Sequence, residues 1–152
     1  MGIFLKDINL KGKTALITGA TKGLGRGAAV AIAEAGGNII AVGRNQSELD
    51  TLKKEIMKFK VNYISFNCDV NNYYRMKLFI SRLKNLDILV NNAGTNIPES
   101  FLIVKKSSLE TLLNVNTKAV FNVAQLCANQ IIKLKRKSGS IINVSSIFGL
   151  VA

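Results

Sequence analysis

The chain has 152 residues, of which 48% are hydrophobic and 20% are charged, a composition that suits one globular domain with its own core. It contains no histidine, which excludes a Ser-His-Asp triad and the usual zinc sites. The formal net charge of +12 allows nucleic acid, a membrane surface or an anionic small ligand as a partner.

Short apolar runs alternate with helical periodicities along the whole chain. The first run, residues 14–18, reads as a buried strand, and a glycine-rich turn and a helix ended by Gly36-Gly37 follow it. The remaining strands are expected over residues 38–42, 61–66, 87–90 and 141–144. No apolar run is long enough to cross a membrane and no signal-peptide pattern is present, so we expect a cytoplasmic protein.

The helices between these strands have candidate capping residues at their starts. Ser47 can cap the second helix and Asn71 the third, while Ser107 or Ser108 can begin a long helical stretch. That stretch runs to about residue 137, with a possible break near Asn116.

Buried strands separated by helices favour parallel pairing with right-handed crossovers. The expected fold is therefore an α/β doubly wound parallel sheet, a Rossmann fold, formed by residues 1–152 as one domain and truncated after its fifth strand. Such sheets bind ligands beyond the carboxyl ends of their strands, so we expect the functional residues in the loops that directly follow each strand.

The loop after the first strand reads Thr18-Gly19-Ala20-Thr21-Lys22-Gly23-Leu24-Gly25. Glycines permit a tight turn and the close approach of backbone to a pyrophosphate. The helix that starts there offers unpaired N–H groups and a positive dipole end to phosphate. The spacing is G-x-x-x-G-x-G rather than G-x-G-x-x-G, and its position between a strand and a helix supports a nucleotide-binding interpretation over a plain structural turn.

With this turn the sequence resembles the short-chain dehydrogenase/reductase family. Four further segments match the family's motifs in the family's order: Asp69-Val70, Asn91-Asn92-Ala93-Gly94, Asn116, and the segment from Gly139 to Ser146. The resemblance covers the chain from about Leu10 to its end, and it is to members like 3-oxoacyl-ACP reductases and gluconate dehydrogenases.

The resemblance implies a nicotinamide dinucleotide cofactor. The residues expected to bind it are Gly19, Thr21, Lys22, Gly23, Leu24, Gly25, Arg44, Asp69, Val70, Asn92, Ala93 and Gly94. No metal is implied. The resemblance also implies a small-molecule carbonyl or alcohol substrate and a homo-oligomer, either a dimer or a tetramer.

The end of the second strand predicts a preference for NADP(H) over NAD(H). An NAD-binding site usually has an acidic residue there for the ribose 2′-hydroxyl, whereas this chain has Gly43 followed by Arg44. Arg44 can fork onto a 2′-phosphate, with Lys22 as a second cation. The alternative is that both are solvated surface charges.

The resemblance identifies Ser146 and Asn116 as catalytic residues, the serine binding the substrate oxygen and the asparagine holding a water in the proton path. The family's proton-transferring Tyr-x-x-x-Lys pair follows the serine, and we expect it beyond Ala152. A Tyr-x-x-x-Lys also occurs at Tyr73, but it precedes the fourth strand and is interpreted as ordinary helix surface. The 152-residue chain alone is thus expected to be inactive.

Ending after the fifth strand would leave an unprotected sheet edge and uncovered apolar helix faces, so we expect the chain alone to be poorly soluble or partly unfolded. A natural short form that binds NADP(H) without turnover is the alternative function. A nucleic-acid binder is the third hypothesis, motivated only by the charge, because no aromatic platform or recognition helix is visible.

The most basic segment, Lys133, Lys135, Arg136 and Lys137, lies where cations complement a helix dipole. Cys68 and Cys127 are expected to be buried free thiols.

Overall fold

The computed structural model describes residues 8–146. Its strands are β1 (Thr14–Thr18), β2 (Asn38–Gly43), β3 (Tyr63–Asn67), β4 (Ile88–Asn91) and β5 (Ser140–Asn143). Its helices are α1 (Gly23–Glu34), α2 (Gln46–Ile56), η1 (Met57–Phe59), α3 (Tyr73–Ile80), η2 (Phe101–Ile103), α4 (Lys106–Leu113), η3 (Asn114–Ala119) and α5 (Val120–Lys133).

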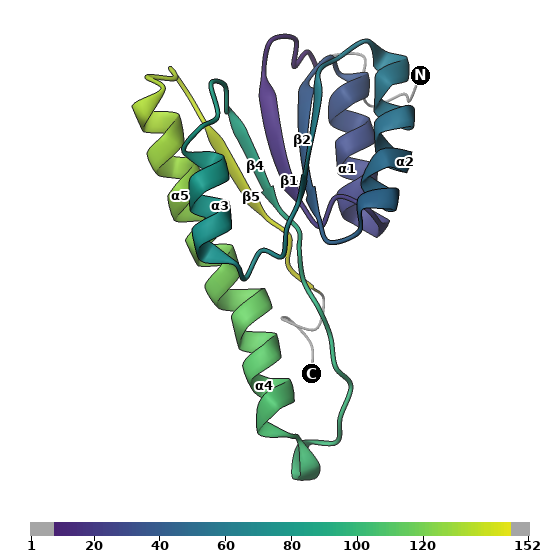
Figure 1. Cartoon of the computed structure of the whole chain (residues 1–152), viewed down its shortest axis with the longest axis vertical. Helices are drawn as coiled ribbons and strands as arrows, with labels where there is room; N and C mark the ends of the chain where they lie inside the picture. The colour runs from purple at the N-terminus through teal and green to yellow at the C-terminus, as the bar shows by residue number, and fades with distance from the viewer. Residues whose placement is uncertain (1–7, 147–152) are drawn as a thin grey trace.

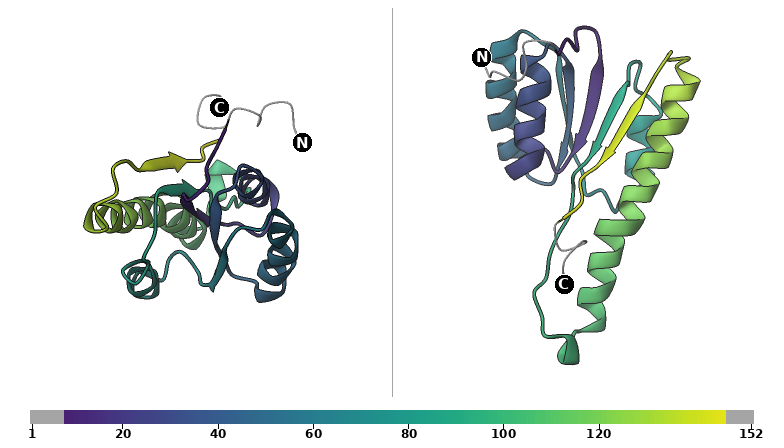
Figure 2. Two further views of the ribbon diagram at one scale, coloured as in Figure 1. Left: turned by 90° about the horizontal axis from the view of Figure 1, so that it is seen from above. Right: turned by 180° about the vertical axis from the view of Figure 1, so that it is seen from behind.

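All five strands pair in parallel in the order β3-β2-β1-β4-β5, which confirms the predicted doubly wound α/β sheet. The chain builds outward from β1 to β3 on one side and then returns to place β4 and β5 on the other. Helices α1 and α2 cover one face, while α3 and α5 cover the opposite face (Figures 1 and 2). The switch of direction beside β1 creates the place where such sheets bind ligands.

The core forms two layers because successive strand residues point to opposite faces. Leu16 of β1 belongs to the cluster shared with α3 and α5, whereas its neighbour Ile17 belongs to the cluster shared with α1 and α2. All five residues of β1 are buried, as expected for the central strand. By contrast, all four residues of β5 are exposed, so β5 forms an open edge of the sheet within the described residues.

Several predicted element ends were wrong by one or two residues. Asn45, not Ser47, caps α2 by accepting a hydrogen bond from the Glu48 N–H, and the Ser47 hydroxyl instead donates to the Asn45 side chain. Asn72, not Asn71, caps α3.

The long helical stretch also starts slightly earlier than predicted. Its first part, α4, begins at Lys106, and no side-chain hydrogen bond caps it. The predicted break near Asn116 is the π-helical turn η3. The third strand begins at Tyr63 rather than at residue 61.

One member of the basic segment has a specific partner. Asp87, which is only 3% exposed, accepts hydrogen bonds from Nε and Nη2 of Arg136 at 2.8 and 2.6 Å. The other carboxylate oxygen, Oδ2, accepts from the Thr14 N–H at 2.9 Å. Nζ of Lys13 lies 3.8 Å from Oδ1, the oxygen that Arg136 contacts. Arg136 thus has a carboxylate partner in addition to its place near a helix end, and the pair fastens the α5–β5 connection to the residues beside β4 and β1. The tertiary structure supplies this partner, and the sequence spacing of 49 residues does not reveal it.

Candidate functional site

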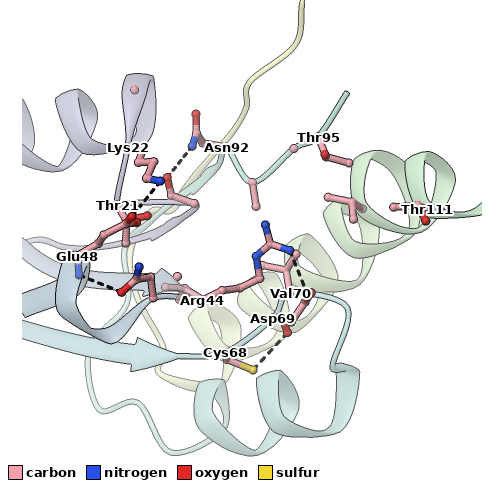
Figure 3. Close-up of a pocket in the computed structure, with 18 residues that line it drawn as sticks. Thr21, Lys22, Arg44, Glu48, Cys68, Asp69, Val70, Asn92, Thr95 and Thr111 are labelled. Carbon is pink, nitrogen blue, oxygen red and sulfur yellow. Dashed lines mark hydrogen bonds and ion pairs between the residues drawn. The ribbon is translucent and has the colours of Figure 1, made fainter. Parts of the chain in front are cut away.

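A pocket of about 520 Å³ opens where the loops after β1, β2, β3 and β4 meet (Figure 3). Ten of the twelve residues predicted to bind a cofactor line it: Gly19, Thr21, Lys22, Gly23, Arg44, Asp69, Val70, Asn92, Ala93 and Gly94. Segments separated by up to 75 residues thus converge on one cavity, as the sheet topology requires.

The glycine turn shapes one wall of this pocket. Gly19 and Gly23 have positive φ angles of 61° and 50°, a conformation that side chains other than glycine rarely adopt. No side chain caps the following helix α1, whose N-cap is Lys22, so its first N–H groups receive no capping acceptor. A turn and helix start of this kind suit an anionic group such as a phosphate.

The two predicted residues that do not line the pocket belong to the same turn. A Cβ at Gly25 would collide with the Gly19 carbonyl and the Asn92 amide, so this glycine permits the close approach of α1 to the turn. Leu24 is 74% exposed and is not part of the lining.

A hydrogen-bond network joins the ends of β1 and β4. The buried hydroxyl of Thr18 accepts from the backbone N–H groups of Asn92 and Ala93, both at 3.0 Å. The Asn92 side-chain amide in turn donates to the carbonyls of Thr18 and Gly19, both at 3.1 Å. Asn92 therefore holds the glycine turn in place, a role that its position in a family motif did not specify.

The charged residues of the pocket form two ion pairs. Nζ of Lys22 lies 2.9 Å from Oε1 of Glu48, and Nη1 of Arg44 lies 3.8 Å from Oδ2 of Asp69 (Figure 3). The hydrogen bond from Lys22 is the main reason why the pKa of Glu48 is lowered, and partial burial opposes this effect. Glu48 was not predicted from the sequence to line the pocket, although its place in the first turn of α2, directly after β2, was a usable signal.

The end of β2 is also shaped by packing. A Cβ at Gly43 would lie 2.7 Å from Cγ2 of Thr21, so the absence of a side chain here has a steric reason in addition to the predicted electrostatic one. A residue larger than glycine would require the Thr21 side chain to shift. Six further lining residues were not predicted from the sequence to belong to the site: Val42, Asn45, Cys68, Thr95, Thr111 and Val115.

The two predicted catalytic residues lie outside the pocket lining. Asn116 occupies the π-helical turn η3, where its Oδ1 accepts from the Thr95 N–H at 2.9 Å and its Nδ2 donates to the Thr95 carbonyl at 2.8 Å. This two-point contact fixes the loop after β4. Ser146 follows β5 by three residues and is exposed.

The remaining predictions concern metals, thiols and membranes. Both cysteines are buried, and burial raises the pKa of Cys127 to about 12 and also raises that of Cys68. Within the described residues no group of three or more potential ligands could hold a metal ion. Over the same residues, no helix combines the length and apolar character needed to span a bilayer.

A doubly wound parallel sheet with a glycine turn at its switch point is the architecture typical of dinucleotide-binding α/β domains. A family model described as short chain dehydrogenase matches residues 13–152. The chain therefore belongs to the short-chain dehydrogenase family, which confirms the predicted resemblance.

Two relatives and one solved structure show how far this similarity extends. L-xylulose reductase of Mesocricetus auratus is 36% identical over 140 residues, covering 92% of this chain and 55% of the relative. The 3-oxoacyl-[acyl-carrier-protein] reductase of Thermotoga maritima is 33% identical over 147 residues, covering 94% and 59%. A short-chain dehydrogenase from Sphingobium yanoikuyae in complex with NADPH is 26% identical with a TM-score of 0.83, covering 91% and 56%. The chain thus spans little more than half of the length of these proteins.

Proposed function

We propose that this chain is the NADP(H)-binding N-terminal part of an oxidoreductase that transfers hydride between the nicotinamide and a small carbonyl or alcohol substrate. The observation that carries this proposal is the convergence of ten predicted cofactor residues on one pocket, with Lys22 and Arg44 among its lining. The relatives named above are reductases, and one structural neighbour holds NADPH, which supports the same reaction class.

The pocket fits a dinucleotide in shape and chemistry. The uncapped start of α1 and the positive-φ glycines would receive the pyrophosphate, and Asp69 and Val70 lie where the family resemblance puts the adenine. When bound, the nicotinamide of the dinucleotide would donate or accept the hydride. Arg44 and Lys22 would bind the 2′-phosphate, and no carboxylate stands at Gly43 to repel it.

Binding measurements with single variants test this cofactor preference. We expect Arg44→Met to weaken NADPH binding roughly 10- to 100-fold, because a charge-assisted hydrogen bond to phosphate is lost, and to change NADH binding by less than about twofold. Lys53→Met is the matched control, since Lys53 is an exposed cation on α2 outside the pocket lining. Isothermal titration calorimetry gives both dissociation constants. Tighter binding of NADH than NADPH by the unmodified protein would contradict the proposal.

A reversal of preference needs a further design step. Gly43→Asp with Arg44→Ala should favour NADH, but the new Cβ would press on Thr21. Adding Thr21→Ser removes the methyl group that this Cβ would meet. We expect the triple variant to prefer NADH. Preference for NADPH in a triple variant with an unchanged circular dichroism spectrum would argue against Arg44 as the phosphate ligand.

For the chemical step we propose that Ser146 donates a hydrogen bond to the substrate oxygen and that Asn116 holds a water in the proton path. The family's tyrosine moves the proton, and a lysine four residues later lowers its pKa. Activity is therefore proposed for the protein that carries this pair. In that protein Ser146→Ala should lower kcat by about 100-fold or more, while NADPH affinity stays within about twofold.

We also propose that the complete protein assembles as a homo-oligomer. Leu109, Leu113 and Phe121, on the α4 and α5 segments of the long helix, are 50%, 46% and 64% exposed. Such apolar surface is typical of subunit interfaces. Light scattering on Phe121→Ser should show a lower mass than the unmodified protein, and an unchanged mass would count against this face.

A further inference from the structure

The two cations assigned to the 2′-phosphate are both already paired with carboxylates of the same pocket (Figure 3). Lys22 and Arg44 carry two positive charges, and Glu48 and Asp69 carry two negative ones. These four side chains together contribute no net charge to the pocket. A phosphate dianion entering it must therefore displace carboxylates from cations, not simply occupy a positive site.

The two ion pairs are not equivalent. Lys22 and Glu48 lie within hydrogen-bond distance at 2.9 Å, whereas Arg44 and Asp69 are separated by 3.8 Å. Asp69 also has a second partner, because its Oδ1 accepts a hydrogen bond from the Asn71 N–H at 2.8 Å within the same turn. The Lys22–Glu48 pair is thus the contact that a phosphate has to open.

Glu48 is held firmly in this position. It lies in the first turn of α2, where the helix dipole favours a negative charge, and its N–H is bonded to the capping side chain of Asn45. Its side chain is 26% exposed, against 78% for Lys22. Lys22 is therefore the more exposed partner of the pair, and the Glu48 carboxylate is the more enclosed one.

We propose that Glu48 sets how strongly this pocket distinguishes NADP(H) from NAD(H), by competing with the 2′-phosphate for Lys22. The inference rests on the proposed function. A carboxylate beside a dianionic phosphate repels it, and it also neutralises the lysine that would attract it. The Lys22–Glu48 pair could also favour binding by holding Lys22 in one position, but this benefit is small because an exposed ion pair contributes little free energy. NAD(H) has no phosphate at that position and does not meet the competition.

Calorimetric titration of Glu48→Gln with two pairs of ligands tests the proposal. NADPH is compared with NADH, and 2′,5′-ADP with 5′-AMP, so that the second pair reports the phosphate without the nicotinamide. We expect Glu48→Gln to tighten NADPH and 2′,5′-ADP roughly three- to tenfold and to leave NADH and 5′-AMP within about twofold. Glu55→Gln is the matched control, since Glu55 lies on the same helix but pairs with Arg26 outside the pocket lining.

A second substitution isolates the competition for Lys22. In a Lys22→Met background, Glu48→Gln should tighten NADPH less than it does in the unmodified protein, because the competition for Lys22 is gone and only the direct repulsion between carboxylate and phosphate remains. Glu48→Ala should reproduce the effect of Glu48→Gln. Weaker NADPH binding in both Glu48 variants, or an equal change for NADPH and NADH, would overturn the proposal. An unmodified protein that binds NADH more tightly than NADPH would instead refute the proposed function, so the two failures are distinguishable.

Discussion

Replacing Thr18 by valine should damage both the stability of the fold and its pocket. Valine keeps the shape of threonine but removes the hydroxyl that accepts the N–H groups of Asn92 and Ala93, each at 3.0 Å. Thr18 is only 1% exposed, so little water can replace the lost acceptor. Each unsatisfied buried donor costs about 1–3 kcal/mol, and we expect a loss of about 2–4 kcal/mol in the free energy of unfolding.

Urea denaturation followed by circular dichroism measures this loss, and calorimetry measures NADPH affinity in parallel. Thr18→Ser is the control, because it retains the acceptor and loses one methyl group, worth about 1 kcal/mol. We expect Thr18→Val to weaken NADPH and NADH equally, since it loosens the loop rather than a phosphate contact. A Thr18→Val protein whose free energy of unfolding lies within about 0.5 kcal/mol of that of the unmodified protein would refute the reasoning, because the two N–H groups would then have found other acceptors.

Three further predictions follow from the packing. Arg136→Met leaves the buried Asp87 carboxylate with weaker compensation and should lower the free energy of unfolding by about 1–3 kcal/mol in urea titrations, with a negligible loss counting against the interpretation. The Tyr63 hydroxyl donates to the Leu49 carbonyl, and burial is the main cause that raises its pKa to about 12. Because the folded pKa lies above the ordinary value of 10, this stabilisation is complete below pH 10 and is lost as pH rises through 12, so the stability difference between the unmodified protein and Tyr63→Phe should shrink over that range. Burial raises the pKa of Cys127 to about 12, so mass spectrometry should find it unmodified by iodoacetamide at pH 8 until urea unfolds the chain.

The sequence predicted the fold because its signals are local and repeated. Apolar runs of strand length and helical periodicities recur in order, and every predicted strand exists in the structure. The ends of elements were less accurate because several neighbouring residues can serve as caps. Asn45 and Ser47 both carry a side-chain oxygen near the start of α2, and only the backbone conformation decides that Asn45 is the cap.

The site was predicted in part for a similar reason. Motif residues that follow a strand converge once the topology is known, which is why Gly19, Asp69 and Asn92 share one pocket. The spacing of motifs along the sequence does not reveal contacts between side chains that are distant in the chain. The pairing of Lys22 with Glu48 and the two-point hold of Asn116 on Thr95 depend on how the loops pack, and the sequence pattern alone indicated neither.

The pocket separates structural residues from those proposed to select the cofactor. Its frame is made by hydrogen bonds that the Thr18 hydroxyl accepts and by glycines whose replacement would cause collisions, so changes there should affect folding and all ligands together. The side chains of its charged residues Arg44 and Lys22 are 79% and 78% exposed, so changes there should alter binding while leaving the free energy of unfolding within about 0.5 kcal/mol. Cofactor preference can therefore change by substitution at the pocket rim without disturbing the sheet. The Thr18 variants test the structural role and the Glu48 variants test the selective one. Only the Glu48 variants should shift the ratio of NADPH to NADH affinity.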